Sequence, residues 1–171
     1  HGQLVRDGTT FEDFLLIRIT IEIDNFQARL SSGEKGRVNE KPIGEFDAGD
    51  LEIAKRRLKE DFALVGLSED LERTMLLWKK HFGGWNAFYQ SINITEGGLD
   101  REQFTLVETA AIHETQAMDL DLYETARKLF AASQSGYSGH YDRDRASFRR
   151  WNKVYGVGAE WETNLPQYYR A

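Results

Sequence analysis

Four closely spaced polar residues, Asp24, Asn25, Gln27 and Arg29, are the strongest candidates for binding chemistry in this sequence. If the stretch is helical, Asn25 and Arg29 lie one turn apart on one face, with Asp24 and Gln27 at neighbouring positions. Guanidinium and amide donors match the oxygens of an anion, and an arginine stays charged inside a cleft. The cluster therefore predicts a site for a sulfate group or a sugar hydroxyl, and the alternative is a solvated helix end.

Other residue types that often carry catalysis form no complete site. His113 and Glu114 begin a zinc-protease pattern, but Ala117 stands at the position of the second histidine. Because His113 shares a predicted helix face with apolar residues, we expect it to be a packed, structural histidine. Asp119 and Asp121 are two residues apart and do not face each other on a helix, which disfavours a glycosidase pair. We therefore assign no catalytic residue and expect no metal.

The C-terminal part mixes basic and aromatic side chains. Between residues 143 and 155 the basic residues are Arg143, Arg145, Arg149, Arg150 and Lys153, and the aromatic residues are Phe148, Trp151 and Tyr155. Such a mixture is typical of a surface that meets RNA or an acidic partner. More often it is typical of an amphipathic helix that packs its rings while the arginine side chains reach solvent. We keep a protein partner as one use of this segment.

The element that carries the polar cluster shows two periodicities. Apolar residues at helical spacing form one stripe: Phe11, Leu15, Ile19, Ile23, Phe26 and Leu30. The isoleucines between 17 and 23 also alternate with polar residues, as in a strand. A capping box at Thr9 and Glu12 favours a helix that begins near residue 11 and continues to residue 30.

A short apolar run, residues 62–65, is followed at once by a helix-start signal. The run is too short and too continuously apolar for an amphipathic helix, so we predict a buried strand. Ser68 is then expected to cap the next helix, with Glu69 and Asp70 at the positive end of its dipole. Gly83 is expected to end that helix by adopting a left-handed conformation.

Most of the remaining chain reads as helix. Residues 50–61 place Leu51, Ala54 and Leu58 on one face. Caps at Asp100 and Asp119 predict helices that end near Glu114 and Gln134, and a last helix is predicted over 143–155. The predicted fold class is mainly α with one short buried strand.

Composition limits the remaining possibilities. With 171 residues, 40% of them hydrophobic, one domain is the expectation. The formal charge of −6 argues against a general nucleic-acid binder. No apolar run approaches the roughly 20 residues that span a bilayer, so we expect no membrane association. Because the chain contains no cysteine, we expect a cytoplasmic protein without disulfides.

Three segments, in the same order along the chain, resemble elements of carbohydrate-type sulfotransferases. Residues 24–30, Asp-Asn-Phe-Gln-Ala-Arg-Leu, resemble that family's Asp-Asn-x-Gln-Thr-Arg element, with Ala28 where the family usually has Thr. Residues 62–70, Phe-Ala-Leu-Val-Gly-Leu-Ser-Glu-Asp, are similar to its Val-Gly-Leu-Ser-Glu signature. Residues 118–126, Met-Asp-Leu-Asp-Leu-Tyr-Glu-Thr-Ala, are similar to its Leu-Asp-x-x-Leu-Tyr-x-x-Ala helix. The resemblance covers roughly residues 11–130.

The resemblance implies a fold, a reaction and a set of contacts. The fold would be the C-terminal part of an α/β, P-loop-like sulfotransferase, with residues 1–136 as its helical region and 137–171 as an aromatic and arginine-rich extension packed on it. The reaction would transfer a sulfuryl group from 3′-phosphoadenosine 5′-phosphosulfate (PAPS) to a hydroxyl group. The expected acceptor is a carbohydrate. Acceptor contacts would fall to Asp24, Asn25, Gln27 and Arg29, and nucleotide contacts to Asn93, Thr95 and Arg101.

The family's donor-binding motifs, a Pro-Lys-x-Gly-Thr/Ser loop and an Arg-x-Pro…Arg…Ser element, do not occur in this sequence. In the family they precede the matching region, and this chain opens with His1-Gly2 rather than methionine. We therefore expect a processed or truncated piece, whose site an upstream segment or a second chain completes and which by itself does not bind PAPS tightly. The alternative is a non-enzymatic helical module, derived from the same fold, that binds another protein.

Overall fold

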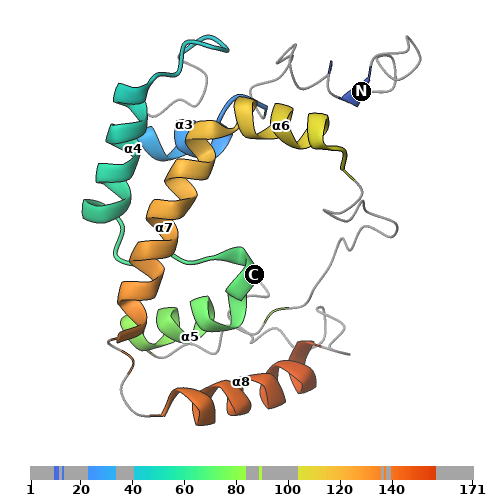
Figure 1. The fold of residues 1–171 in the computed structure, drawn as a ribbon. Helices are drawn as coiled ribbons and strands as arrows, with labels where there is room; N and C mark the ends of the chain where they lie inside the picture. The colour runs from blue at the N-terminus through green and yellow to red at the C-terminus, as the bar shows by residue number, and fades with distance from the viewer. Residues whose placement is uncertain are drawn as a thin grey trace, which may run out of the picture. The chain divides into compact units, whose positions relative to one another are not determined.

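The computed structural model consists of helices and connecting turns. It describes residues 10, 11, 13, 23–33, 41–83, 89, 104–135, 137 and 140–156. In chain order the elements are α3 (Phe26–Ser32), α4 (Ala48–Glu60), the 3-10 turn η3 (Ser68–Asp70), α5 (Leu71–Phe82), α6 (Leu106–Thr115), α7 (Ala117–Ser135) and α8 (Tyr141–Gly156) (Figure 1). The prediction of a mainly helical chain is confirmed. None of these described helices is both long and apolar enough to cross a bilayer.

The chain divides into two compact units. The first contains residues 1–65 and 97–129, and the second contains residues 66–96 and 130–171. Residues 117–129 of α7 thus belong to the first unit and its last turns to the second. Residues 137–171, predicted as an extension, fall in the second unit together with α5.

In the first unit, α4 begins where its sequence carries a strong local signal. The Asp47 carboxylate accepts hydrogen bonds from the backbone N–H groups of Gly49 and Asp50, and the Asp50 side chain accepts from Asp47 N–H, which completes a capping box. Leu51 and Ala54 are buried and Leu58 packs against them, as the helical pattern predicted. The helix starts at Ala48, two residues earlier than predicted, because Asp47 is the cap.

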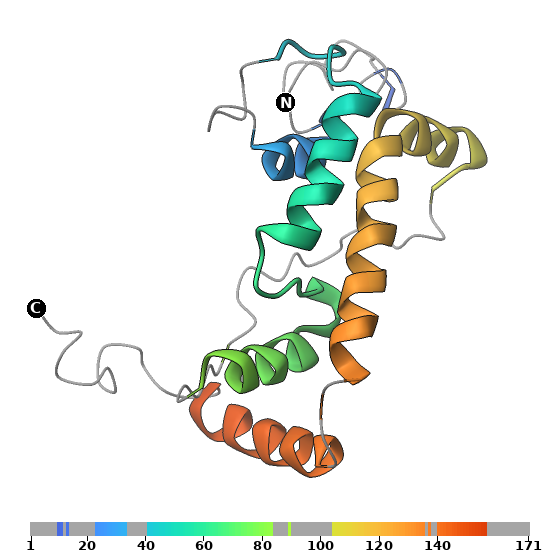
Figure 2. The same ribbon diagram turned by 90° about the vertical axis from the view of Figure 1, so that its left-hand side faces the viewer.

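A turn separates α3 from the residues before it, so the prediction of one unbroken helix over residues 11–30 is wrong. Asn25 has φ 54° and ψ 49°, a left-handed conformation that stops helix propagation. Residues 14–22 lie outside the described part of the chain. The helix that follows inserts Ala28 into a core with Phe46, Leu51, Ala54 and Leu122. Both ribbon views show α4 beside the first half of α7, which supplies Leu122 (Figure 2).

The two consecutive helices α6 and α7 also belong in part to the first unit. Thr105 and Glu108 form a capping box at the start of α6, so the helix begins at Leu106 and not just after Asp100 as predicted. The predicted ends near Glu114 and Gln134 agree within one residue with the observed ends at Thr115 and Ser135. The start of α6 is therefore set by the capping box of Thr105 and Glu108.

At the end of residues 1–65 of the first unit, the predicted strand is absent. Residues 62–65 run without regular structure, and Phe62 is 50% exposed while Leu64 and Val65 are half-buried. A strand needs a partner for its backbone hydrogen bonds, and the described residues offer no second extended segment. The apolar run is therefore a connection that leads into η3.

The start of α5 is held by a threonine and not by the predicted serine. Ser68 to Asp70 form the turn η3, and α5 begins at Leu71 without a side-chain cap. The Thr74 hydroxyl accepts from Leu67 N–H and donates to Leu67 C=O, both at 3.0 Å. Gly83 ends the helix with φ 72° and ψ 164°, a positive φ outside the left-handed helical region that we predicted.

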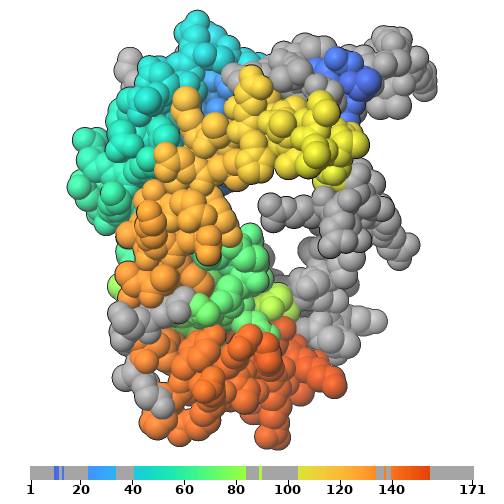
Figure 3. All heavy atoms as spheres, viewed as in Figure 1, coloured from blue at the N-terminus to red at the C-terminus, as the bar shows by residue number. Residues whose placement is uncertain are grey.

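The last described helix, α8, begins two residues before the predicted range 143–155 and ends one residue after it. It packs on α5. Phe148 is buried, whereas Trp151 is 44% exposed. Figure 3 shows α8 side chains against those of α5. The predicted amphipathic helix is confirmed as a helix, with only part of its aromatic side chains turned inward.

Candidate functional site

The four residues of the predicted acceptor site lie at and just before the start of α3, and three of them are buried. Asp24 is 1%, Asn25 5% and Arg29 4% exposed, whereas Gln27 is exposed. Burial of charged side chains is costly unless every polar atom finds a partner. Their hydrogen-bond partners therefore decide what they can do.

Arg29 is bound on several sides by protein oxygens. Its Nε donates to the Asp24 carbonyl at 2.8 Å, and its two Nη atoms donate to the carbonyls of Lys41 and Pro42, each at 2.9 Å. One Nη also contacts the Asp24 carboxylate in a buried ion pair. The guanidinium further lies 5.3 Å from the ring centroid of Phe46. Arg29 thus joins the start of α3 to the 41–46 turn.

Asp24 and Lys41 complete this connection. The Asp24 carboxylate accepts from Gly44 N–H at 2.8 Å. Lys41 Nζ lies 2.6 Å from an Asp50 carboxylate oxygen, a hydrogen bond that raises the pKa of Lys41. Because the Asp50 side chain also belongs to the α4 cap, the turn and two helix starts form one hydrogen-bonded network.

A second set of contacts joins the N-termini of α3 and α7 reciprocally. The Asn25 side-chain oxygen accepts from the N–H groups of Met118 and Asp119, at 2.9 and 3.2 Å, in the first turn of α7. In return, the Asp119 carboxylate accepts from the N–H groups of Gln27 and Ala28, at 3.1 and 2.7 Å, in the first turn of α3. Asp119 was predicted to cap its own helix, and instead it caps a helix about 90 residues away in sequence.

This reciprocal cap places a carboxylate in a partly buried position. Loss of hydration raises the pKa of Asp119, the two backbone hydrogen bonds lower it, and the nearby Asp24 carboxylate raises it. Gln116 adds a third bridge, because its side-chain amide donates to the Ile23 carbonyl at 2.6 Å. Among the described residues, no buried side-chain nitrogen or oxygen lacks a partner. The network is therefore internally satisfied, and of the four residues of the predicted acceptor site it is Gln27 that is exposed.

The predicted nucleotide contacts Asn93, Thr95 and Arg101 lie outside the described residues. His113, expected to be packed, is exposed on α6, so that prediction is wrong. The helix face it shares with apolar residues is not the face that α6 buries. Within the described ranges, no group of three or more histidine, aspartate or glutamate side chains has the geometry of a metal site.

In the second unit, two arginines of α8 converge on one glutamate of α5. Arg145 Nε lies 3.0 Å and Arg149 Nε 2.8 Å from Glu72 carboxylate oxygens. The hydrogen bond from Arg149, with that from Arg145, lowers the pKa of Glu72 against the opposing effect of burial. These two arginines therefore hold α8 to α5, whereas Arg143 and Arg150 remain exposed beside them.

The structure also contains a pocket that the sequence interpretation missed. Its described lining consists of Arg73 and Leu77 from α5, Tyr137, and Tyr141 from α8, around a volume of about 240 Å³. Arg73 and Leu77 are four residues apart on α5, a spacing that can place both side chains on one helix face. Tyr137 precedes α8, and Tyr141 is the first residue of that helix. The spacing was visible in the sequence, but the pairing of α5 with α8 was not.

Comparison of the chain with models of protein families, with curated proteins and with solved structures finds no match. The resemblance to carbohydrate-type sulfotransferases therefore rests on the three segments described above.

Proposed function

We propose that this chain is the helical C-terminal part of a sulfotransferase-like protein that transfers a sulfuryl group from PAPS to a carbohydrate hydroxyl. One observation carries the proposal: two of the three segments that resemble the family bind each other through their characteristic residues. Asn25 of the segment 24–30 caps α7, and Asp119 of the segment 118–126 caps α3. If the chain resembles the family because it shares the family's fold, the shared residues are expected to contact one another in the structure.

In this proposal the Asp-Asn-x-Gln-Ala-Arg element is a scaffold that positions the acceptor side of the site. The Arg29 N–H groups donate to protein carbonyl oxygens, so a sulfate could bind Arg29 only by displacing those oxygens. Gln27 is the one side chain of the element that is exposed and able to contact an acceptor directly. The catalytic base and the donor loop belong to sequence that precedes the resembling region in the family.

Donor binding tests the proposal. Calorimetry with 3′-phosphoadenosine 5′-phosphate should give millimolar or weaker affinity for the 171-residue chain, because the charge-assisted phosphate contacts, worth roughly 1.5–3 kcal/mol each, are supplied elsewhere. The same titration on the chain extended by the residues encoded before His1 should give a Kd on the order of micromolar. Failure of the extended protein to bind the nucleotide would refute the enzyme proposal.

A second experiment separates the scaffold role from an acceptor-binding role. Arg29→Lys keeps the charge but cannot reproduce donors to Asp24, Lys41 and Pro42 together, so we expect a loss of about 1.5–3 kcal/mol in the free energy of unfolding. Gln27→Ala should leave stability unchanged within about 0.5 kcal/mol, because the side chain is exposed. Equal stability of the Arg29→Lys and Gln27→Ala variants would contradict the scaffold role.

A second candidate function, a module that binds another protein, is favoured by the outer face of α8. Trp151 is 44% and Val154 58% exposed, and the Arg150 guanidinium lies 5.9 Å from the Trp151 ring centroid. An exposed tryptophan beside arginine is a common composition for an interface centre. If the extended protein does not bind the nucleotide, this candidate remains, and Trp151→Ala should then abolish binding to its protein partner without unfolding the chain.

A further inference from the structure

The pocket of about 240 Å³ in the second unit has a lining suited to a small ligand. Drug-sized ligands occupy pockets of about 300–1,000 Å³, so this one fits a molecule with a single ring. Its described lining combines the buried Leu77 and two tyrosine rings with one guanidinium, that of Arg73. All four residues belong to the second unit, so the pocket is independent of the network around Arg29.

Arg73 is held in place by aromatic and ionic contacts. Its guanidinium carbon lies 5.2 Å from the Phe130 ring centroid and 5.9 Å from that of Tyr141. Its Nε lies 3.0 Å from an Asp70 carboxylate oxygen one turn earlier in the chain. Within the part of the chain that the structure describes, no acceptor is bound to either Nη atom. A fixed guanidinium with both Nη groups available is the arrangement that binds a carboxylate end-on through two hydrogen bonds.

The tyrosines form the flat walls. The rings of Tyr137 and Tyr141 meet edge to face, with centroids 5.3 Å apart and an interplanar angle of 86°. The Tyr137 hydroxyl donates to an Asp144 carboxylate oxygen at 3.1 Å, and burial together with this bond raises the pKa of Tyr137 to about 12. Tyr137 therefore stays neutral at physiological pH, and its orientation is fixed from outside the pocket.

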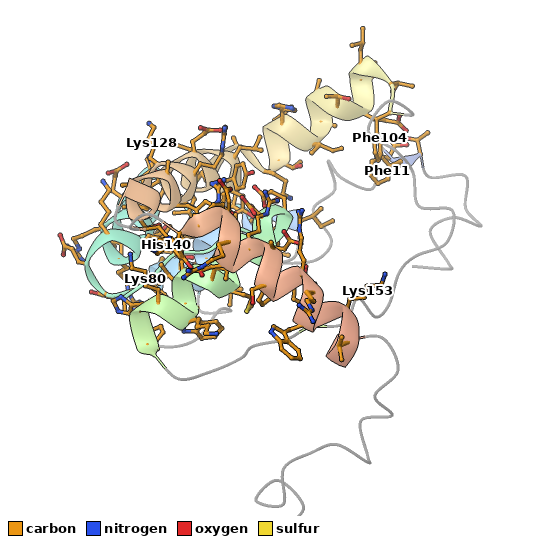
Figure 4. All side chains as sticks on the ribbon, turned by 90° about the horizontal axis from the view of Figure 1, so that it is seen from below. Phe11, Lys80, Phe104, Lys128, His140 and Lys153 are labelled. Carbon is orange, nitrogen blue, oxygen red and sulfur yellow. The ribbon has the colours of Figure 1, made fainter. Side chains whose placement is uncertain are left out.

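A second cation lies beside the aromatic walls. Lys80 of α5, labelled in Figure 4, has its Nζ 4.8 Å from the Tyr137 ring centroid. With Arg73 it places two cations at the aromatic walls. Asp70 pairs with Arg73 and Asp144 accepts from the Tyr137 hydroxyl, so these two carboxylates balance the two cations in number. The preference for an anion therefore rests on the available Nη groups of Arg73.

We propose that this pocket is a binding site for a small aromatic carboxylate, whose ring packs against Leu77, Tyr137 and Tyr141 and whose carboxylate binds the Nη groups of Arg73. The carboxylate oxygens accept two hydrogen bonds from the guanidinium, and the ring replaces water against an apolar and aromatic lining. The site goes beyond the sulfotransferase proposal, since it requires neither the donor nor the acceptor of that reaction.

The native chain tests the proposal with benzoate as the probe. Titration followed by NMR should show benzoate binding about tenfold to hundredfold more tightly than benzamide, its neutral isostere, because only the carboxylate makes charge-assisted bonds to Arg73. Intermolecular NOEs should connect the benzoate ring to the Tyr137 and Tyr141 rings. Benzamide binding as tightly as benzoate, or NOEs that map to other residues, would overturn the proposal. Tighter binding of phenyl phosphate would replace the carboxylate by a tetrahedral oxyanion and would also overturn it.

Two matched variants locate the recognition. Arg73→Lys keeps the positive charge but loses the planar fork, so benzoate should bind about tenfold more weakly than to the native chain. Arg56→Lys, at an exposed position on α4 in the first unit, makes the same chemical change and should leave benzoate affinity unchanged. Unchanged affinity in a folded Arg73→Lys variant would refute the assignment. If that variant does not fold, the comparison of benzoate with benzamide and the NOEs on the native chain decide the question.

Discussion

The reciprocal cap between α3 and α7 makes a strong prediction for the substitution Asp119→Ala. The Asp119 carboxylate accepts from Gln27 N–H at 3.1 Å and from Ala28 N–H at 2.7 Å. Removal of a helix cap costs about 0.5–2 kcal/mol. The Ala28 bond is partly buried, so its N–H would also be poorly hydrated, which places the expected cost near the upper end, at about 2 kcal/mol.

Urea unfolding followed by circular dichroism measures this cost. With a slope of roughly 2 kcal/mol per molar urea, a loss of about 2 kcal/mol lowers the unfolding midpoint by about 1 M. Asp121→Ala is the matched control, because Asp121 lies on the same helix, is exposed and pairs with Lys55 at 2.8 Å. A surface ion pair of this kind contributes about 0–1 kcal/mol, so its midpoint should fall by less than about 0.5 M. Equal shifts for the two variants would refute the reasoning.

The acid dependence of the same variant provides an independent check. Burial raises the pKa of Asp119, so the folded chain holds this proton more tightly than the unfolded chain does. The stability that this titration contributes is fully present below the carboxyl's usual pKa and is lost as the pH rises through the raised value. The stability difference between the native chain and Asp119→Ala should therefore be larger at acidic pH than at neutral pH.

Three further predictions concern other parts of the fold. Asn25→Ala should cost about 1 kcal/mol more than Asn25→Gly in urea unfolding, because both lose the α7 cap but only alanine is strained at φ 54°. Glu72→Gln should flatten the loss of stability in acid: the pKa of Glu72 is lowered by Arg149, so the native contribution is present above the usual glutamate pKa and disappears as the pH falls through the lowered value. Gly33→Ala should lower the melting temperature more than Gly44→Ala, since both have positive φ but only a Cβ at Gly33 would lie 1.5 Å from the Arg57 guanidinium, which binds the end of α3.

The sequence alone predicted those elements whose signals are local. The Leu51, Ala54 and Leu58 pattern identified α4, and the ends of α6 and α7 were predicted within one residue. Helical periodicity and end signals depend on residues within one turn of each other, so they can be recognised without the fold. The mainly helical class followed from the same signals.

The functions of individual side chains depended on contacts between distant segments. Arg29 reads as an exposed anion ligand on a helix, but the carbonyls of Lys41 and Pro42 surround it only after the 41–46 turn has folded over α3. Asp119 reads as the cap of its own helix, yet it caps α3 because the two N-termini converge. Residues 62–65 read as a strand because their apolar run is compatible with one, but no partner segment among the described residues completes a ladder.

The sequence by itself determined where most helices lie, and it determined which polar residues the chain carries at Asp24, Asn25 and Arg29. The tertiary structure alone decided that these residues bind one another and their neighbours. It also decided that Arg73 and Tyr141 line one pocket, in which the Nη groups of Arg73 are available to a ligand. The reason is physical: helix formation is governed by interactions over three or four residues, whereas the burial and pairing of a charge depend on which distant segments exclude water from it.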